Sequence, residues 1–421
     1  MKRLIAAALF GGAMLGTVNA QPEQMPQTGK PVLLAREEAV TRALTNDPGV
    51  AAAAQSIRAA SATARQAGLL LNPTLDLQLE NFGGTGSLSG VDRAEATYAL
   101  TQEIEFGGDR RARHTAAERE VDTTRIRAGI STLDLREEVE LAFVETQAAE
   151  AFADVARSRL EVAKEFAEAV DRRVRAARDP EAARTRISAR LAEAETEALT
   201  AISRAGAAKA ALASYWGGAP DFVVETAPFF NPDARDYNVE GSPDLALADA
   251  ERASAAARVE IERAMRVPDL NVRAGFRELR ESNDTAFVVG VSIPLPIWNR
   301  NSGALAAARA NERRAEYVAA ARERELVREI ASLSSQAAAA RTEINAYEER
   351  VIPSGEKALA QSLHAYRQGG LSYIEVLEAQ SSLGAARLRQ ISVLRTYHRA
   401  EVKLARRRGL LGSRNPQEIY Q

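Results

Sequence analysis

The stretch Pro73-Thr-Leu-Asp-Leu-Gln-Leu-Glu80 alternates apolar and polar residues, so that its leucines share one face and its polar side chains share the other. A period of two residues predicts a β-strand, here over about 74–82, with one apolar and one polar side. The same alternation predicts three more strands, over about 94–106, 270–278 and 285–297. Their lengths are close to the roughly nine to eleven residues with which a tilted strand crosses a bilayer.

These strands come in two pairs because the chain is duplicated. Pro48 corresponds to Pro243 and, at the same offset, Pro73 corresponds to Pro268. In each half an alanine-rich helix precedes two strands, a very long helix and a return helix. Four strands are too few to close an up-and-down barrel, which needs about eight. We therefore expect several copies of the chain to build one barrel together, with a soluble antiparallel sheet as the alternative.

The helix after each strand pair is unusually long. These helices are predicted over about 112–177 and 303–367, where Pro353 is the only strong breaker. At a rise of 1.5 Å per residue, each would be about 100 Å long. Apolar residues recur in them at steps of three and four, the spacing of helices that pack against partner helices. The sequence thus predicts a mainly α chain of two long α-helical hairpins with a small β part of four strands.

The first twenty residues predict a secretory signal peptide. Lys2-Arg3 precede an apolar run, and Val18-Asn19-Ala20 ends in small residues at a cleavage site. No second run of about eighteen apolar residues follows, so a membrane-spanning helix is not expected. The chain has no cysteine, which excludes disulfides and thiolate metal sites. The expected organisation is a signal peptide at 1–20, a mobile leader at 21–33, and two repeats at 34–230 and 231–421.

Neither charge nor motifs indicate nucleic acid binding or catalysis. The formal net charge is only −2, and arginines alternate with glutamates along the helices. His114, His364 and His398 are scattered and lack the spacing of a zinc-binding helix, so we expect each at an ordinary helix surface. Nucleophile elbow, Walker loop and dinucleotide fingerprint are all missing from the sequence. An enzyme is therefore not expected, and neither is a cofactor or a resident metal.

Two segments at strand-to-helix junctions resemble a known family. Thr101-Gln-Glu-Ile-Glu-Phe-Gly-Gly-Asp-Arg110 and Val291-Ser-Ile-Pro-Leu-Pro-Ile-Trp-Asn-Arg-Asn-Ser-Gly303 are similar to the TolC-like outer-membrane efflux proteins. The second segment most resembles the cobalt–zinc–cadmium resistance (CzcC-like) branch. The resemblance covers both repeats. It implies a homotrimer with a twelve-stranded β-barrel in outer-membrane lipid and an α-helical tunnel through the periplasm. It also implies two partners, a periplasmic adaptor (membrane fusion) protein and an inner-membrane proton-driven pump.

The same resemblance places residues at the tip of the second hairpin, between Tyr366 and Glu378. Tyr366 matches a tyrosine that helps to hold the periplasmic aperture shut. Glu375 and Glu378 match an acidic aperture ring, and their spacing puts both on one helix face. A solvated helix face is the alternative for these two glutamates. The adaptor-contacting tip is then Gly369, Gly370 and Leu371, with positive φ expected at the glycines.

The resemblance does not supply every part of a gate. Leu371 stands where some family members have a gating arginine. The corresponding turn of the first hairpin, at 177–180, matches the family poorly, so no gate partner is assigned from it. The leading interpretation is a passive exit duct for heavy-metal cations. A duct for drugs or secreted proteins is the alternative within the family. From another class, an exported coiled-coil scaffold or a periplasmic adaptor is the alternative, although an adaptor should carry one hairpin and a glycine-rich lipoyl-like domain.

Overall fold

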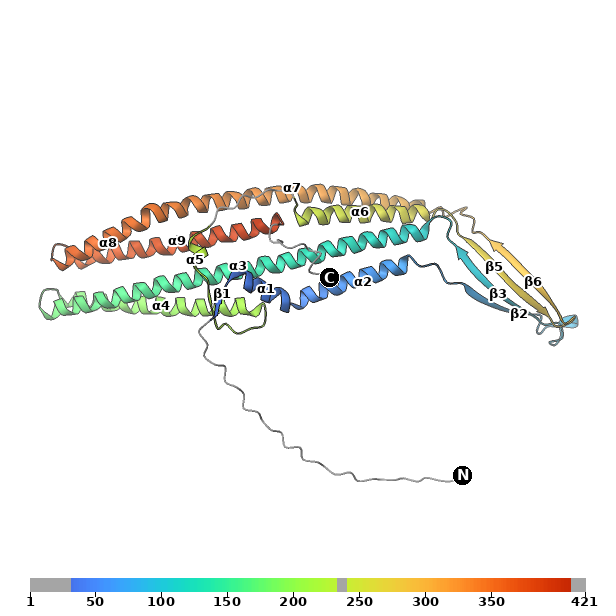
Figure 1. The fold of residues 1–421 in the computed structure, drawn as a ribbon, viewed down its shortest axis with the longest axis horizontal. Helices are drawn as coiled ribbons and strands as arrows, with labels where there is room; N and C mark the ends of the chain where they lie inside the picture. Colours follow the sequence, from blue (N-terminus) through green and yellow to red (C-terminus); the bar gives the residue numbers. More distant parts are fainter. Residues whose placement is uncertain (1–31, 233–240, 410–421) are drawn as a thin grey trace, which may run out of the picture.

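Two helical hairpins form most of the length of the molecule, and a sheet lies at one end (Figure 1). The computed structural model describes residues 32–232 and 241–409 of the 421 residues, so the predicted signal peptide lies outside the described residues. The first hairpin pairs α3 (Asp109–Arg175) with α4 (Glu181–Ser214). The second pairs α7 (Ser302–Ala346) and α8 (Ile352–Arg367) with α9 (Tyr373–Arg407). Among the described residues, no helix is both long and apolar enough to cross a bilayer.

Shorter helices lie along the hairpins on the side of the sheet. α1 (Arg36–Asn46) and α2 (Pro48–Ala67) accompany α3, and α6 (Pro243–Ala264) lies between α3 and α7. The break between α1 and α2 has a local cause, because the Asp47 side chain accepts a hydrogen bond from the Val50 amide at 3.0 Å. This cap starts α2. Pro48 occupies the first position of the helix, where a backbone N–H would have no partner within the helix, so the lack of one in proline loses no hydrogen bond. Pro243 occupies the corresponding first position of α6, although no side chain caps that helix.

The sheet unites the two repeats. It consists of β2 (Thr74–Glu80), β3 (Glu95–Ile104), β5 (Leu270–Leu279) and β6 (Asp284–Ser292), all antiparallel and in that order. A one-turn 3₁₀ helix, Gly86–Leu88, lies in the loop between β2 and β3. The β3–β5 pair joins the repeats, with Tyr98 opposite Phe276 and their rings stacked at 5.1 Å. β2 and β6 each pair on one side only, so both edges of the sheet are open.

The last strand is shorter than the alternation of 285–297 indicated. β6 ends at Ser292, and residues 293–300 have no regular structure. Pro294 and Pro296 explain the difference, because a proline has no N–H to donate to a neighbouring strand. Alternating side chains can persist beyond the point where the hydrogen-bonded ladder stops.

Two short strands were not predicted, and the expected total of four strands is therefore incomplete. β1 (Val32–Leu34) pairs in parallel with β4 (Phe222–Val224), which is followed by the four-residue helix α5 (Ala227–Phe230). Three residues are too few to display alternation. The predicted leader reached residue 33, whereas the pairing of β1 begins at Val32. Leu34 packs with Phe222 in an apolar cluster against α3.

The second long helix is not uniformly α-helical as the sequence suggested. Tyr347–Val351 form a π-helical turn between α7 and α8. Pro353 lies two residues after this turn, and its ring would clash with the carbonyl four residues earlier in a regular α-helix. The wider π turn accommodates this proline without ending the helix.

The hairpins pack through alanine-rich seams and a buried ion-pair network. The largest core cluster joins α3, α7 and α9 and contains Ala148, Ala151, Ala337 and Ala400 among larger residues. Arg406 of α9 is only 2% exposed and donates to Asp134 of α3 at 2.6 Å and to Asp244 of α6 at 3.0 Å. A buried guanidinium needs such partners, because an unpaired buried charge is costly. The network thereby links three helices from both repeats.

Candidate functional site

The two hairpin tips, at the end opposite the sheet (Figure 1), are closed by the same type of turn. After α8, the Gly369 amide donates to the Tyr366 carbonyl at 3.0 Å and the Gly370 amide to the Ala365 carbonyl at 2.9 Å. After α3, the Ala177 and Arg178 amides donate in the same pattern, each at 2.9 Å. Both are Schellman turns, which need a left-handed residue just after the helix. That residue is Gly369, with φ of 80°, in one tip and Ala177, with φ of 56°, in the other.

The expectation of positive φ is wrong for Gly370. Among the described residues with positive φ, Gly369 is present and Gly370 is not. A Cβ at Gly370 would lie 3.6 Å from the Ala365 carbonyl oxygen, an ordinary contact. Of these two glycines, only Gly369 therefore has a backbone conformation that favours glycine. Leu371 is half-buried next to this turn.

A cluster of four side chains connects the two tips within one chain, and we call Phe166, Arg173, Asp179 and Tyr366 the tip cluster. Arg173 of α3 donates to both carboxylate oxygens of Asp179, at 2.8 and 3.1 Å. Its guanidinium carbon lies 4.9 Å from the ring centroid of Tyr366, a cation–π contact. The Tyr366 ring also lies 5.5 Å from the ring of Phe166, and Tyr366 is 5% exposed. The first hairpin thus holds the tyrosine of the second.

The ionisable groups of the tip cluster influence one another. The hydrogen bond from Arg173, together with its charge, lowers the pKa of Asp179. Burial is the main cause that raises the pKa of Tyr366. Asp179 lies close enough to the Tyr366 hydroxyl to affect that pKa, although the two form no hydrogen bond of normal geometry. At neutral pH the cluster therefore contains a charged arginine, a charged aspartate and a neutral tyrosine.

Glu375 has a structural contact that the sequence analysis missed. Its Oε2 accepts hydrogen bonds from the Ser372 amide at 2.8 Å and from the Ser372 hydroxyl at 2.9 Å, which completes a capping box at the start of α9. The signal was visible, since Ser372-Tyr-Ile-Glu375 has the Ser-x-x-Glu pattern of this motif. The carboxylate therefore fixes the first turn of α9.

Glu378 lies one turn further along α9 and is exposed, as is Glu375. In residues 32–232 and 241–409, neither glutamate forms an ion pair. Glu378 lines a groove of about 310 Å³ between α9 and the first hairpin, together with Arg159 and Arg190. Neither glutamate belongs to the tip cluster. Their predicted role in an aperture ring stays a prediction, because it depends on how copies of the chain meet.

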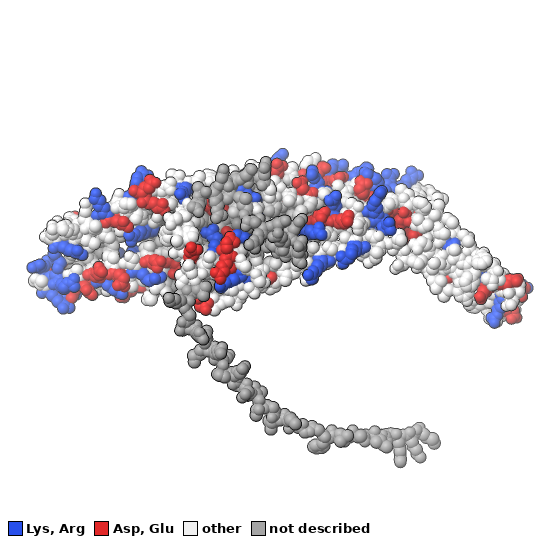
Figure 2. All heavy atoms as spheres, in the orientation of Figure 1, with Lys and Arg blue, Asp and Glu red and all other residues white. Residues whose placement is uncertain are grey.

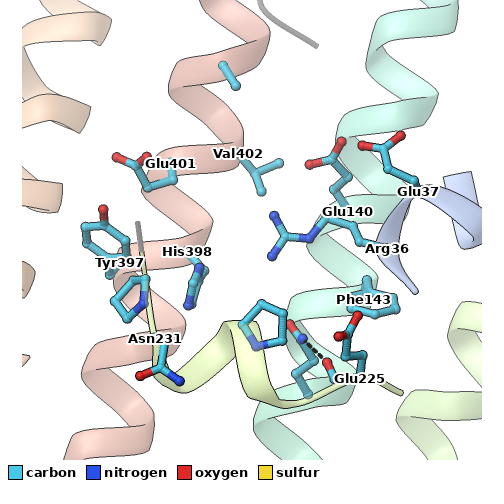
Figure 3. A pocket seen from close by; sticks show the side chains of 14 residues that line it. Arg36, Glu37, Glu140, Phe143, Glu225, Asn231, Tyr397, His398, Glu401 and Val402 are labelled. Carbon is cyan, nitrogen blue, oxygen red and sulfur yellow. Dashed lines mark hydrogen bonds between the residues drawn. The ribbon is translucent and has the colours of Figure 1, made fainter. Parts of the chain in front are cut away.

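A second cavity lies halfway along the helices, between charged side chains. It has a volume of about 240 Å³ and lies between α1, α3, α5 and α9 (Figure 3). Glu140, Glu225 and Glu401 line it together with Arg36 and His398 (Figure 3). In the part of the chain that the structure describes, no three side chains of His, Cys, Asp or Glu are arranged to hold a metal ion.

The expectation of an ordinary helix surface is wrong for His398. This side chain is buried, its Nε2 lies 2.8 Å from the Phe229 carbonyl oxygen, and its ring stacks on that of Phe229 at 5.2 Å. His398 thus anchors α5 on α9, and a lone histidine in a helix gives no sequence signal for such a contact. His114 lies 3.6 Å from Glu118 on a helix surface, and His364 contacts Gln368.

Comparisons with known proteins agree over most of the chain. A model of the outer membrane efflux protein family matches residues 39–218 and 238–410. The cobalt-zinc-cadmium resistance protein CzcC of Cupriavidus metallidurans is 29% identical over 377 residues, which cover 87% of this chain and 88% of that protein. The nickel and cobalt resistance protein CnrC of the same organism is 30% identical over 296 residues, 69% of each chain. The resemblance at the two strand-to-helix junctions is thereby confirmed.

Solved structures share the fold. The outer membrane protein VceC of Vibrio cholerae superposes with a TM-score of 0.73 at 22% identity, covering 89% of this chain and 96% of that one. CusC superposes with a TM-score of 0.75 at 17% identity, covering 88% and 91% of the two chains. The CmeC outer membrane channel of Campylobacter jejuni gives 0.76 at 15% identity, covering 91% and 88%. At these identities the similarity establishes the architecture of hairpins and sheet.

Proposed function

Since this chain belongs to the outer membrane efflux protein family, we propose that it is the outer-membrane exit duct of a three-part pump that exports heavy-metal cations. The pump and a periplasmic adaptor protein would supply energy and most of the selectivity. The duct itself would be passive and would need no cofactor. Its export would depend on the signal peptide at 1–20.

One observation carries this proposal: the sheet leaves a whole apolar face uncovered. Phe287 is 92% exposed, Val289 75% and Leu75 67%, all on the same face. On the opposite face Arg277 pairs with Glu80 and Glu95. Figure 2 shows the sheet almost free of charged side chains on the visible side, between its charged far end and the charged helices. One apolar and one polar face is the pattern of a strand with lipid on one side and water on the other.

The dimensions agree with a membrane position. β3 and β5 have ten residues each, which span about 33 Å at roughly 3.3 Å per residue. A barrel strand tilted by about 40° would then reach about 25 Å along the membrane normal, the height of the apolar band of such barrels. Open edges at β2 and β6 invite pairing with further copies. Three copies would give a twelve-stranded barrel and an α-helical tunnel in the periplasm.

The tips would form the periplasmic end of the tunnel. We assign Glu375 and Glu378, the aperture glutamates, to its rim, and Gly369, Gly370 and Leu371 to the adaptor contact. The tip cluster supports this assignment, because Arg173 and Asp179 are placed to restrain Tyr366. Release of this contact would let the second hairpin move away from the first. Arg173 and Asp179 are therefore our proposed gate partners for Tyr366.

Disulfide cross-linking tests the shared barrel, since the chain has no cysteine of its own. Leu77→Cys in β2 would be combined in turn with Phe287→Cys, Val289→Cys or Val291→Cys in β6, all on the apolar face. A disulfide needs Cβ atoms about 3.5–4.5 Å apart, so only one or two pairs should react. Oxidised membranes should then contain covalent species of up to three chains. Each cysteine alone is the matched control, and monomers in all three pairs would contradict the shared barrel.

Growth assays test the cargo. A strain that lacks this chain but keeps its adaptor and pump should lose resistance to zinc, cobalt and cadmium salts, and the chain should restore it. Restored resistance to hydrophobic drugs without any effect on metals would favour the alternative within the family. If the chain restores metal resistance while it remains in the periplasm as a soluble monomer, the scaffold or adaptor alternative would be favoured.

A further inference from the structure

The four places where helices meet the sheet share a pattern of side chains. α2, α3, α6 and α7 all reach the strands at the same end of the helical part (Figure 1). At each junction exposed apolar residues stand beside exposed arginines. The apolar members are Leu70, Phe106, Met265, Leu295 and Trp298. The basic members are Arg65, Arg110, Arg111, Arg266 and Arg300. We call these ten residues the junction girdle.

The apolar members that follow β6 come directly after a strand of the uncovered face. Ile293 follows β6 directly and is exposed, and every residue from 291 to 300 is exposed as well. Trp298 is 94% exposed, although a tryptophan usually buries its large ring or places it at a membrane–water interface. Pro294 and Pro296 keep this segment out of the sheet, and a tight turn follows, in which the Ile297 amide donates to the Leu295 carbonyl at 2.8 Å. An exposed apolar segment that ends in a tryptophan is suited to the boundary layer of a bilayer.

The basic members have no carboxylate partner among the described residues. Among residues 32–232 and 241–409, none of these five guanidinium groups forms an ion pair. The nearby acids are engaged or turned inward: Glu105 pairs with Arg113, Glu262 accepts a hydrogen bond from Asn301, and Asp109 is buried. Glu103 lies on the polar face of β3, opposite Asn271. The outward charge at the junctions is therefore positive.

We propose that the junction girdle binds the headgroup layer of the leaflet on the helix side of the membrane, with Trp298 among the lipid carbonyls and the arginines on phospholipid phosphates. This inference rests on the proposed membrane position of the sheet. Guanidinium groups match phosphate geometry and bind it through several N–H donors. The girdle selects anionic phospholipid and fixes how deeply the sheet sits. Each arginine near an anionic membrane surface increases the affinity for that surface by about fivefold.

The test uses the reconstituted full-length protein with a single tryptophan. Trp216→Phe leaves Trp298 as the only reporter and keeps a ring against Phe222, which lies 5.8 Å from Trp216. Bilayers would contain phosphatidylcholine and phosphatidylglycerol, with bromine on the acyl chains of one lipid at a time. We expect a blue-shifted emission and stronger quenching by brominated phosphatidylglycerol than by brominated phosphatidylcholine.

Charge variants test the lipid preference. Arg266→Gln combined with Arg300→Gln should remove the preference for phosphatidylglycerol and leave the blue shift. Arg324→Gln combined with Arg328→Gln is the matched control, because both arginines are exposed and unpaired among the described residues but lie further along α7. This control should keep the preference. Equal quenching by both lipids in the parent protein would overturn the role of the arginines.

A second reporter separates this inference from the proposed function. Phe287→Trp, with both native tryptophans changed to phenylalanine, reports on the middle of the apolar face. If this reporter is in lipid while Trp298 is quenched by aqueous acrylamide, the girdle is refuted and the duct remains. If both reporters face water, the membrane position of the sheet fails and the girdle with it. If Trp298 is shielded from acrylamide and from both lipids, it lies between copies of the chain, which also refutes lipid binding.

Discussion

Asp179→Asn should loosen the contact between the two hairpin tips. The change removes the carboxylate charge that accepts both hydrogen bonds of Arg173. Hydrogen bonds to charged groups contribute about 1.5–3 kcal/mol, and the 30% exposure of the Arg173 side chain reduces this to about 1–2 kcal/mol. Once Arg173 is free to move, its cation–π contact with Tyr366 is lost as well, which removes about 0.5–1 kcal/mol more. The combined loss of about 1.5–3 kcal/mol should therefore make local opening of the tips about 10- to 150-fold more frequent.

Amide hydrogen exchange measured by mass spectrometry reports this opening directly. Peptides from both tips, at 174–183 and 363–377, should exchange faster in Asp179→Asn. Asp171→Asn is the matched control, because the partners of Asp171, Arg175 and Arg184, belong to the first hairpin only. It should affect the first tip alone. If Asp179→Asn leaves exchange at 363–377 unchanged, the tip cluster does not couple the hairpins.

The same contact predicts a dependence on pH. The pKa of Asp179 is lowered in the folded chain by Arg173. A lowered carboxyl pKa contributes stability that is fully present above the ordinary value of about 3.9 and is lost as pH falls through the lower folded value. Near neutral pH, Asp179 stays ionised, so its ionisation should not affect amide exchange at 363–377. In strong acid, protonation of Asp179 should accelerate this exchange. The Asp179→Asn variant should lack that acceleration.

Three further outcomes are expected. Gly369→Ala should destabilise the second tip by about 1–2 kcal/mol in hydrogen exchange, whereas Gly370→Ala should be nearly neutral, because only the former has positive φ. Gly275→Ala should lower the yield of assembled protein on size-exclusion chromatography, because the added Cβ would lie 2.1 Å from a backbone oxygen of β3. Gly290→Ala is the control and should assemble normally, because the nearest atom to its added Cβ would be 3.9 Å away. Replacement of both aperture glutamates by glutamine should reduce the cation selectivity of the reconstituted pore, seen as a smaller reversal potential in a salt gradient, with folding preserved because glutamine also completes a capping box.

Much of the architecture could be predicted because its signals are local and repeated. Alternation over 73–80 and its counterparts reports which face of a strand is apolar, and heptad spacing reports that the helices need partners. β1 and β4 could not be predicted, since these strands of three residues gain their stability from pairing with residues 190 positions away in the sequence. The end of β6 was misjudged because alternation continues through Pro294 and Pro296, where hydrogen bonding cannot.

The candidate site was less accessible to sequence reasoning. Ser372 and Glu375 form a local motif that the spacing alone could have identified. The contact of Arg173 with Tyr366 joins residues almost two hundred positions apart, so no pattern in either segment indicates it. Similarly, the predictions for His398 and Gly370 were wrong because burial and backbone angles depend on which residues become neighbours in space, and the local sequence does not show this.

The sequence by itself determined the duplicated order of elements, the apolar face of each long strand and the two reversals of the chain. These follow from side-chain periodicity and from glycine and proline, whose effects act within a few residues. Only the tertiary structure decided that the repeats join through β3 and β5, and that an arginine of the first tip holds the tyrosine of the second. Such contacts arise because packing brings distant segments together, and the free energy of packing depends on the whole surface that is buried.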